Sequence, residues 1–179
     1  MCKFIFTGPE SSGKTTLCEI LNQKYNITYN KEFARVYLKK IKRDYTKKDL
    51  LKIAINQLKL EIYHQSRTKD TITILDTDLI TIKIWSEYKY KQCDKWILEK
   101  INNQKQENRF YFLCKPDISW EKCELRENPD NRMQLFNLYI KELERLDHKY
   151  LIVEGKKRID QCLQKISSIN KNFFYNNIV

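Results

Sequence analysis

The stretch FIFTGPESSGKTTL, residues 4–17, is the most informative part of this sequence. The chain has only three glycines in 179 residues, and two of them, Gly8 and Gly13, stand five residues apart directly after an apolar run. The run CKFIF is typical of a strand buried on both faces, and apolar residues recur at helical spacing after the second glycine. The two glycines therefore lie between a predicted strand and a predicted helix.

Residues 8–15 fit G-x-x-x-x-G-K-[ST], the pattern of a phosphate-binding loop (P-loop) when a strand precedes it and a helix follows it. A loop that wraps a phosphate turns its backbone N–H groups inward, which needs φ values or close approaches that a Cβ would block. The following helix directs the positive end of its dipole toward the same anion. A tight turn with a helix-capping serine is the alternative, but it does not explain why four specified positions coincide. The pattern therefore predicts binding of a nucleoside triphosphate.

The loop predicts two cofactors, ATP and Mg²⁺. Lys14 is expected to reach the β- and γ-phosphates, and the Thr15 hydroxyl is expected to be a ligand of Mg²⁺. The predicted ATP-binding residues are Gly8, Ser11, Ser12, Gly13, Lys14, Thr15 and Thr16.

Two aspartates follow TITIL, the predicted strand at residues 71–75. In open α/β sheets ligands bind beyond the carboxyl ends of the strands, so we expect Asp76 and Asp78 to lie near the P-loop. Asp76 is the candidate to support Mg²⁺, and Asp78 is a candidate to orient the hydroxyl group of an acceptor substrate. Capping of the following helix by Asp78 is expected as a concurrent role.

Glu32 and Arg35 follow the predicted second strand, residues 26–30. A carboxylate at this position can serve as general base toward an acceptor hydroxyl, and Arg35 can hold that carboxylate or bind phosphate. Without the P-loop, the two residues would be an ordinary surface ion pair at spacing i, i+3. Glu32 and Asp78 are both candidates for the general base.

The stretch LRENPDNR carries Arg126 and Arg132 on either side of a predicted helix start. Asn128 is expected to cap this helix, with Pro129 at its first position. A kinase must exclude water, and a mobile segment that carries arginines achieves closure and charge stabilisation together. Residues 117–132 are therefore predicted to form a lid whose two arginines close over the transferred phosphoryl group.

Strands alternate with helices along the whole chain, which predicts an α/β fold of the P-loop NTPase type. The expected architecture is a five-stranded, mainly parallel sheet with flanking helices and a helical lid. The predicted strands are residues 2–6, 26–30, 71–75, 109–114 and 150–155. A long helix is expected to begin at Thr46 and to bury an apolar face made of Leu51, Ala54, Ile55, Leu58 and Ile62. Residues 1–170 are predicted to form one domain, and residues 171–179 a tail.

The formal net charge of +11 raises the alternative of nucleic-acid binding. The lysines lie in all segments rather than in one stripe, and the sequence contains no helix-turn-helix signature or aromatic-interleaved RNA-binding motif. No specific nucleic-acid partner is therefore expected, and attraction of anionic substrates is a secondary effect of the charge.

The six cysteines form no C-x-x-C pair, and only two histidines, His64 and His148, could assist a metal site. Neither a disulfide framework nor a zinc site is predicted. No apolar run approaches the roughly 20 residues that cross a bilayer, so no membrane span is expected. The N-terminus enters a strand-like run at once, without an export signal, which predicts a cytoplasmic protein.

Taken together, these signals resemble the ribosylnicotinamide kinase domain of the bacterial NadR proteins, a branch of the P-loop kinases. The resemblance rests on TGPESSGKTTL, EFAR, ILDTDLITIKIWSE and DISWEKCELRENPDNR in this order, and it extends from residue 3 to about residue 169. It implies a five-stranded parallel sheet with a lid. It also implies ATP-dependent phosphorylation of the 5′-hydroxyl of nicotinamide riboside to the mononucleotide.

The resemblance adds residues for the nucleoside pocket. Trp85 would lie near this pocket, where its indole face could stack on a pyridinium ring. Core packing is the alternative for Trp85. Gln57 and Glu61 are further candidates to line the same cleft.

Full-length NadR proteins also carry an adenylyltransferase domain with an H-x-G-H pair, which this sequence lacks, so a free-standing kinase domain is expected. The expected partner is a small-molecule nucleoside. Two other functions stay open: a kinase for another nucleoside or small alcohol, and a nucleotide-dependent module that binds a partner or an anionic lipid surface. No prediction of the oligomeric state follows from the sequence.

Overall fold

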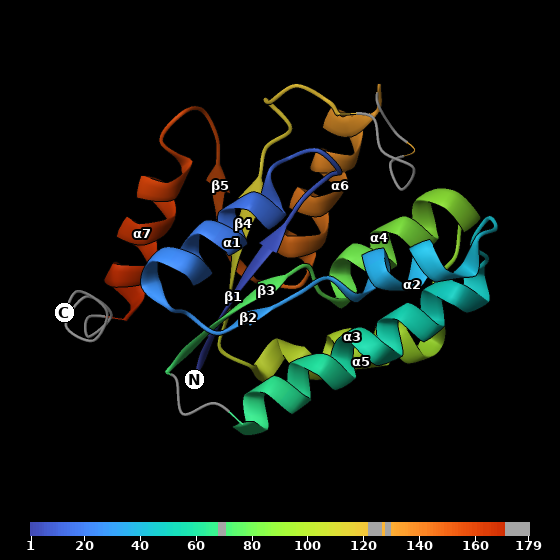
Figure 1. Ribbon diagram of the computed structural model, residues 1–179. Helices are drawn as coiled ribbons and strands as arrows, with labels where there is room; N and C mark the ends of the chain where they lie inside the picture. Colours follow the sequence, from blue (N-terminus) through green and yellow to red (C-terminus); the bar gives the residue numbers. More distant parts are fainter. Residues whose placement is uncertain (68–70, 122–126, 128–129, 171–179) are drawn as a thin grey trace.

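The computed structural model describes residues 1–67, 71–121, 127 and 130–170. Within them, five strands form one parallel sheet in the order β2-β3-β1-β4-β5 (Figure 1). The strands are β1 (Cys2–Thr7), β2 (Tyr29–Asn30), β3 (Ile72–Asp76), β4 (Arg109–Cys114) and β5 (Lys149–Val153). The helices are α1 (Lys14–Tyr25), α2 (Phe33–Ile41), α3 (Lys47–Arg67), α4 (Leu79–Tyr90), α5 (Lys95–Asn103), the 3₁₀ helix η1 (Gln104–Gln106), α6 (Arg132–Arg145) and α7 (Arg158–Ile169). The predicted five-stranded parallel α/β fold is thus confirmed.

Strand β1 lies at the centre of the sheet, with Phe6 opposite Asp76 of β3 and Thr7 opposite Leu113 of β4. The chain goes from β1 to β2 and β3 on one side, and then crosses to β4 and β5 on the other. The strand order therefore reverses at the carboxyl end of β1, which is where open α/β sheets bind ligands.

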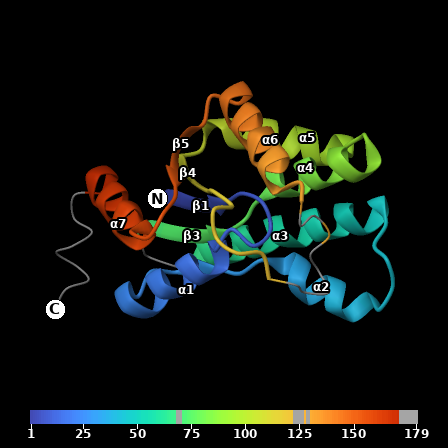
Figure 2. The same ribbon diagram turned by 90° about the horizontal axis from the view of Figure 1, so that it is seen from above.

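Helices cover both faces of the sheet, and each face has its own apolar core (Figures 1 and 2). Ile5 belongs to the core shared with α3, α4, α5 and α6, whereas Phe4 and Phe6 belong to the core shared with α1 and α7. This alternation is the period of two that a strand imposes, and every residue of β1 is buried because both faces of the strand are covered. Phe6 packs on Phe112 of β4 with ring centroids 4.9 Å apart.

Helix α3 begins as predicted, but its predicted apolar face is only partly correct: Ala54 is buried and Leu51 and Leu58 pack against the core. The Asp49 carboxylate accepts hydrogen bonds from the backbone N–H and the hydroxyl of Thr46, both at 2.8 Å, so the acidic half of the predicted capping box forms. The Asp49 N–H donates to the Thr46 carbonyl (3.0 Å) instead of the hydroxyl. However, Ile62 is 57% exposed, whereas Gln57 and Glu61 are buried. Gln57 and Glu61 tolerate burial because they have polar partners in the fold, and apolar periodicity cannot detect such partners.

Two other elements differ from the expectation. Strand β2 has only two residues, at the end of the predicted segment 26–30. Helix α6 begins at Arg132 instead of Pro129, and the side chain of its N-cap residue, Asn131, makes no capping hydrogen bond. Asn128, Pro129, part of the predicted lid and the predicted tail lie outside the described residues.

No helix of the described residues is long and apolar enough to cross a membrane. The described cysteines are free thiols. The described residues also contain no group of three or more His, Cys, Asp and Glu side chains arranged to hold a metal ion.

Candidate functional site

The P-loop connects β1 to α1 at the carboxyl edge of the sheet, and both of its glycines have positive φ. Gly8 has a φ of +130°, and a Cβ at this position would lie 2.6 Å from the carbonyl oxygen of Cys114 in β4. Gly13 has a φ of +80° and is the N-cap of α1. Ser11 also has a positive φ, +50°, although it is not a glycine. The loop needs glycine at position 8 for space and at position 13 for backbone conformation.

Lys14, the first residue of α1, closes over the loop. Its Nζ donates hydrogen bonds to the carbonyl oxygens of Gly8 (2.9 Å) and Pro9 (2.7 Å). The Ser12 hydroxyl donates to the same Pro9 carbonyl (2.7 Å). Because Gly13 supplies no side-chain cap, the first N–H groups of α1 are free to bind an anion.

Asp76, at the end of β3, lies against the start of α1. Its Oδ2 accepts hydrogen bonds from the hydroxyls of Thr15 (2.7 Å) and Tyr29 (3.2 Å). Its Oδ1 is buried and has no hydrogen-bond partner among the described residues. A buried carboxylate oxygen without a donor is unfavourable, and a cation would relieve the cost. Thr15 and Asp76 therefore form an oxygen donor set that fits Mg²⁺.

Glu32 and Arg35 form a second polar group beside Thr15. Arg35 donates from Nε to Glu32 Oε2 (3.0 Å) and from Nη2 to the Thr15 hydroxyl (3.1 Å). Burial raises the pKa of Glu32, and the negative charge of Asp76 raises it further, while Lys14 and Arg35 oppose the shift. The Glu32 carboxylate is thus a stronger base than an exposed glutamate.

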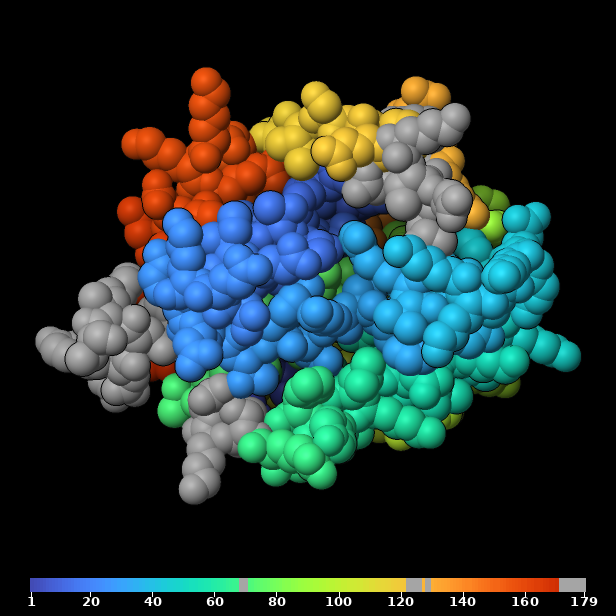
Figure 3. All heavy atoms as spheres, in the orientation of Figure 1, coloured from blue at the N-terminus to red at the C-terminus, as the bar shows by residue number. Residues whose placement is uncertain are grey.

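Lys14, Thr15, Glu32 and Arg35 line a cavity of about 320 Å³ bounded by the P-loop, α1, α2 and α4, whereas Asp76 lies outside its lining. Figure 3 shows α1 in blue and α2 in cyan on the same face of the molecule. The cavity brings together all seven predicted loop residues with Glu32, Arg35 and Trp85. Its other lining residues, which were not predicted, are Glu10, Glu19, Ala34, Leu38 and Thr81.

A second cavity, of about 240 Å³, adjoins the first and shares Glu10, Leu38 and Trp85 with it. Trp85 is half-buried and also packs against the core under α4. Core packing and a place at the predicted nucleoside pocket, the two alternatives for this residue, are therefore compatible. The remaining lining residues are Tyr45, Tyr88, Lys89, Glu127 and Leu135. Three of its eight lining residues are aromatic and two are acidic, and its Lys89 pairs with Glu127.

The structure does not bring Asp78 to either cavity, which corrects its predicted contact with an acceptor. Its Oδ1 accepts a hydrogen bond from the Ile80 N–H (3.0 Å), so Asp78 caps α4 as expected. Its Oδ2 accepts from the Tyr111 hydroxyl (2.8 Å), with the Arg109 guanidinium 3.4 Å away. The carboxylate is fully enclosed by these partners.

Gln57 and Glu61 are buried outside both cavities, which corrects their predicted place in the substrate cleft. Gln57 Oε1 accepts a hydrogen bond from the Phe33 N–H (2.7 Å) and so fixes the start of α2. Glu61 accepts from Lys3 Nζ (2.7 Å) and pairs with Arg109. Both side chains hold secondary-structure elements together.

Of the two predicted lid arginines, Arg126 lies outside the described residues. Arg132 Nη1 donates to the carbonyl oxygens of Ser11 (3.2 Å) and Ile118 (3.0 Å). Arg132 thus contacts the backbone of the P-loop and lines neither cavity.

Sequence reasoning did not single out Glu10, Thr81 or Arg158. Glu10 occupies a position that the P-loop pattern leaves free. Thr81 stands one helical turn before Trp85, so spacing alone could have placed both on one face of α4. Arg158 has no local signal, because the Ser12 carbonyl that it contacts is 146 residues away in sequence.

A P-loop after the central strand of a parallel sheet, with a strand-end aspartate against the loop threonine, defines a P-loop nucleotide-binding protein. A family model described as an AAA domain matches residues 3–160, and the chain belongs to this family. A comparison with curated protein sequences found no significant match.

Several solved structures share the fold. The NadR protein in complex with NR (nicotinamide riboside) matches with a TM-score of 0.72 and 17% identity over 93% of this chain and 51% of that chain. NadR in complex with NAD and AMP-PNP matches with a TM-score of 0.67 and 19% identity over 93% and 49%. Deoxyadenosine kinase from M. mycoides with bound dCTP matches with a TM-score of 0.59 and 18% identity over 93% and 99%. The fold is that of P-loop nucleoside and nucleotide kinases, and this chain spans about half the length of the NadR structures.

Proposed function

We propose that this chain is an ATP-dependent kinase that phosphorylates the 5′-hydroxyl of nicotinamide riboside, giving nicotinamide mononucleotide. The observation that carries the proposal is one cavity lined by the P-loop together with Glu32 and Trp85. A phosphate donor on the loop and an acceptor on the other wall would meet there in a defined orientation. The fold shared with a NadR protein in complex with NR supports the choice of acceptor.

The loop supplies the groups that would bind the triphosphate. Lys14 Nζ already lies at the loop, held by two carbonyl oxygens, and in the proposed complex it contacts the β- and γ-phosphates. Thr15 and Asp76 would hold Mg²⁺, which neutralises charge on the phosphate oxygens when it is bound. The buried Asp76 Oδ1, without a partner among the described residues, supports this assignment.

Glu32 is the proposed general base. Of the two carboxylates first considered, Glu32 lines the cavity and Asp78 does not. Arg35 orients the Glu32 carboxylate through a 3.0 Å hydrogen bond. In the proposed reaction, Glu32 accepts the proton of the acceptor hydroxyl as that oxygen attacks the γ-phosphorus of ATP, and ADP leaves.

The second cavity is the proposed site for the nicotinamide ring. Trp85, Tyr45 and Tyr88 supply aromatic surface and Glu10 and Glu127 are acidic, but Lys89 Nζ lies 3.8 Å from the Tyr45 ring centroid and pairs with Glu127 (3.0 Å). A cation is attracted both to the faces of aromatic rings and to carboxylates. The ring of nicotinamide riboside is a pyridinium cation, so in the proposed complex it lies against Trp85, and Lys89 has to leave Tyr45 for the ring to use that face as well.

The same site could serve a different nucleoside. The deoxyadenosine kinase from M. mycoides matches over 99% of its own length, compared with 51% for the NadR protein with NR. This likeness supports a second candidate function, a kinase with another nucleoside as acceptor.

The test is ADP production from Mg²⁺-ATP by the purified chain, with nicotinamide riboside, a panel of other nucleosides and no acceptor measured in parallel. We expect stimulation by nicotinamide riboside alone. Stimulation by another nucleoside would keep the mechanism and replace the acceptor. Slow turnover that no acceptor stimulates would contradict the kinase and favour a nucleotide-dependent binding module.

Two variants control this experiment. Lys14→Ala should lower turnover by about 100-fold or more, because it removes a cationic donor from the transferred phosphate. Lys24→Ala removes the same side chain from the exposed far end of α1 and should turn over like the wild type. Wild-type turnover by Lys14→Ala would exclude the P-loop as the phosphate site.

A further inference from the structure

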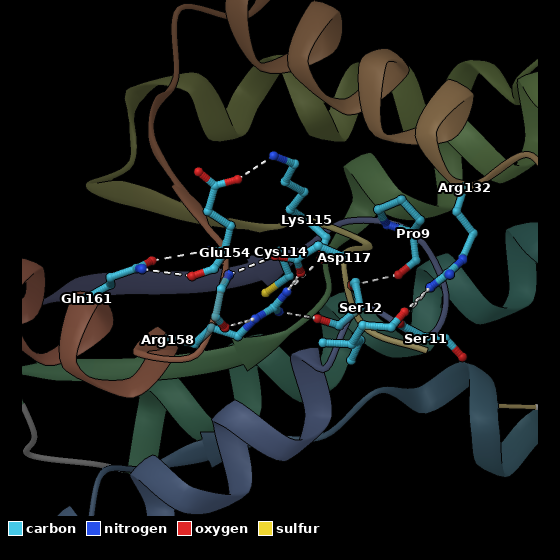
Figure 4. Close-up of polar contacts among 12 residues, drawn as sticks. Pro9, Ser11, Ser12, Cys114, Lys115, Asp117, Arg132, Glu154, Arg158 and Gln161 are labelled. Carbon is cyan, nitrogen blue, oxygen red and sulfur yellow. Dashed lines mark hydrogen bonds and ion pairs between the residues drawn. The ribbon is translucent and has the colours of Figure 1, made fainter. Parts of the chain in front are cut away.

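Arg158, the first residue of α7, joins three loops at the carboxyl edge of the sheet (Figure 4). Its guanidinium donates from Nη1 to the Ser12 carbonyl (2.8 Å), from Nη2 to the Lys115 carbonyl (2.8 Å) and from Nε to the Gly155 carbonyl (3.2 Å). It also pairs with Asp117, whose carboxylate accepts a hydrogen bond from the Gly155 N–H (2.7 Å). Arg158 is only 8% exposed, so these protein groups nearly enclose it.

Arg132, at the start of α6, makes the neighbouring contact. Its Nη1 donates to the Ser11 carbonyl (3.2 Å) and to the Ile118 carbonyl (3.0 Å), so two arginines hold the consecutive carbonyls of Ser11 and Ser12 (Figure 4). Ser11 has a φ of +50°, which a non-glycine residue keeps only when its surroundings hold it there. The Glu121 N–H adds a further restraint by donating to the Ser11 hydroxyl (3.2 Å).

Because the peptide unit is rigid, a contact that fixes a carbonyl also fixes the direction of the N–H group in the same peptide plane. In a trans peptide the C=O and N–H bonds point in opposite directions across one plane. When Arg132 holds the Ser11 carbonyl, the Ser12 N–H of the same peptide plane points away from Arg132. When Arg158 holds the Ser12 carbonyl, the Gly13 N–H likewise points away from Arg158. The three loop residues line the cavity, whereas Arg132 and Arg158 lie outside its lining. With the carbonyls held on the side of the arginines, the two N–H groups would face the cavity side of the loop.

We propose that Arg158 and Arg132 are positioning residues for the nucleotide, which hold two peptide planes of the P-loop so that the Ser12 and Gly13 N–H groups point at the phosphates before ATP binds. Donors that are already oriented lose less free energy in ordering when the anion arrives. The inference rests on the proposed binding of a nucleotide by the P-loop. The identity of the acceptor plays no part in it.

The charge of Arg158 gives a competing explanation, because any nearby cation attracts a triphosphate. The Asp117 carboxylate neutralises this guanidinium at close range, which weakens its attraction for a distant anion. The exposed Lys157, the residue before Arg158, is the natural control for a pure charge effect.

The experiment measures the dissociation constant of AMP-PNP with Mg²⁺ by calorimetry for the wild type, Arg158→Met, Arg158→Lys and Lys157→Ala. Arg158→Met removes every donor and should weaken binding about tenfold or more. Arg158→Lys keeps the charge but cannot reach three carbonyls, so its loss should be intermediate. Lys157→Ala should stay within about twofold of the wild type. In turnover, KM for ATP should rise in Arg158→Met while kcat at saturating ATP stays unchanged.

A nuclear magnetic resonance readout separates positioning from general destabilisation. The chain has three glycines, so the Gly13 amide signal is readily assigned. AMP-PNP should shift the Ser12 and Gly13 amides in the wild type, and the Gly13 shift should shrink in Arg158→Met at saturating nucleotide. Should that variant fail to fold, Arg132→Met, at a less buried side chain, tests the same idea at the Ser12 amide.

Three results would overturn the inference. Wild-type affinity and amide shifts in both methionine variants would show that the arginines do not position the loop. An equal loss in Lys157→Ala and Arg158→Met would assign the effect to charge alone. A wild-type chain that binds no AMP-PNP would overturn the proposed function together with this inference, so the two failures are distinguishable.

Discussion

At the residue scale, Gly8 is the position of the loop that tolerates substitution least. A Cβ would lie 2.6 Å from the Cys114 carbonyl oxygen, and the φ of +130° is unfavourable for any other residue. Gly155 also has a positive φ, +69°, but a Cβ there would meet none of the described atoms within 4 Å. Substitution of Gly8 therefore combines a steric clash with backbone strain, whereas substitution of Gly155 tests the backbone strain alone.

We expect Gly8→Ala to lower the free energy of unfolding by about 3 kcal/mol or more and to abolish AMP-PNP binding, because β4 cannot yield to the new methyl group. Gly155→Ala should cost only about 1–2 kcal/mol, the strain of the backbone conformation. Urea unfolding measures both values, and calorimetry measures the binding. Equal losses of stability in the two variants would show that the loop relieves the contact with Cys114 by a small shift.

The raised pKa of Glu32 predicts the direction of a pH dependence. Burial, and next the charge of Asp76, raises the pKa above the ordinary 4.5 of glutamate. A general base works only when it is ionised, so kcat/KM should fall as the pH is lowered through this raised pKa. Glu32→Gln should lower kcat by about 10²- to 10⁴-fold and remove the acid limb, with both substrates still bound.

The matched control for Glu32 is Asp78→Asn, which changes the enclosed carboxylate that was the other candidate base. This variant should lose stability because Asp78 caps α4, but its pH profile should keep the acid limb. An acid limb that survives in Glu32→Gln would assign the proton transfer to another group.

At the element scale, the start of α3 depends on one buried carboxylate that also joins it to α2. Asp49 accepts hydrogen bonds from Arg43 (2.7 and 3.0 Å), from the Tyr37 hydroxyl of α2 (2.7 Å) and from Thr46 (2.8 Å). The hydrogen bonds from Arg43, supported by those from Tyr37 and Thr46, hold the pKa of Asp49 far below 3.8, although burial opposes this shift. The cluster stabilises the fold only while Asp49 is ionised.

The depressed pKa gives the sign of a stability change with pH. A carboxyl group with a lowered pKa in the folded state stabilises the fold above its unfolded value, and this contribution is lost as the pH falls toward the folded value. Asp49→Asn should therefore lower the free energy of unfolding by about 1–3 kcal/mol at pH 7, and its difference from the wild type should shrink below about pH 4.

Urea unfolding at a series of pH values tests this prediction. Asp44→Asn makes the same change at an exposed position of the same loop and should behave like the wild type at every pH. A deficit in Asp49→Asn that is constant down to pH 2 would mean that the carboxylate charge does not stabilise the helix start.

At the scale of the whole molecule, the walls of the cavity belong to different layers. Helix α1, which carries Lys14 and Thr15, packs in the core with α7. Glu32 and Trp85 come from the segments of α2 and α4, which pack in the core on the other face. The parallel strands between these cores set the distance between the proposed phosphate donor and its acceptor. In the proposed reaction, the alignment of donor and acceptor therefore depends on the sheet that separates the two cores.

The P-loop, the strand-end Asp76 and the alternation of strands with helices could be predicted because each depends on residues within a short stretch. Gly8 is a sequence signal for a close backbone approach, and the structure supplies its partner, Cys114. Part of the buried face of α3 and the acceptor contact of Asp78 were not predicted correctly, although Asp78 caps α4 as expected. Periodicity counts apolar residues, whereas Glu61 and Asp78 are buried beside Arg109, which is distant from both in sequence.

Local sequence was therefore enough to predict a phosphate-binding loop and the fold that carries it, because backbone conformation and periodicity act over a few turns of chain. Packing between distant elements was needed to place Glu32 at the cavity, to remove Asp78 from it, and to bring Arg158 to the Ser12 carbonyl 146 residues away. The physical reason is that the direction, burial and partners of a side chain depend on the neighbouring layer, which the adjacent residues do not specify.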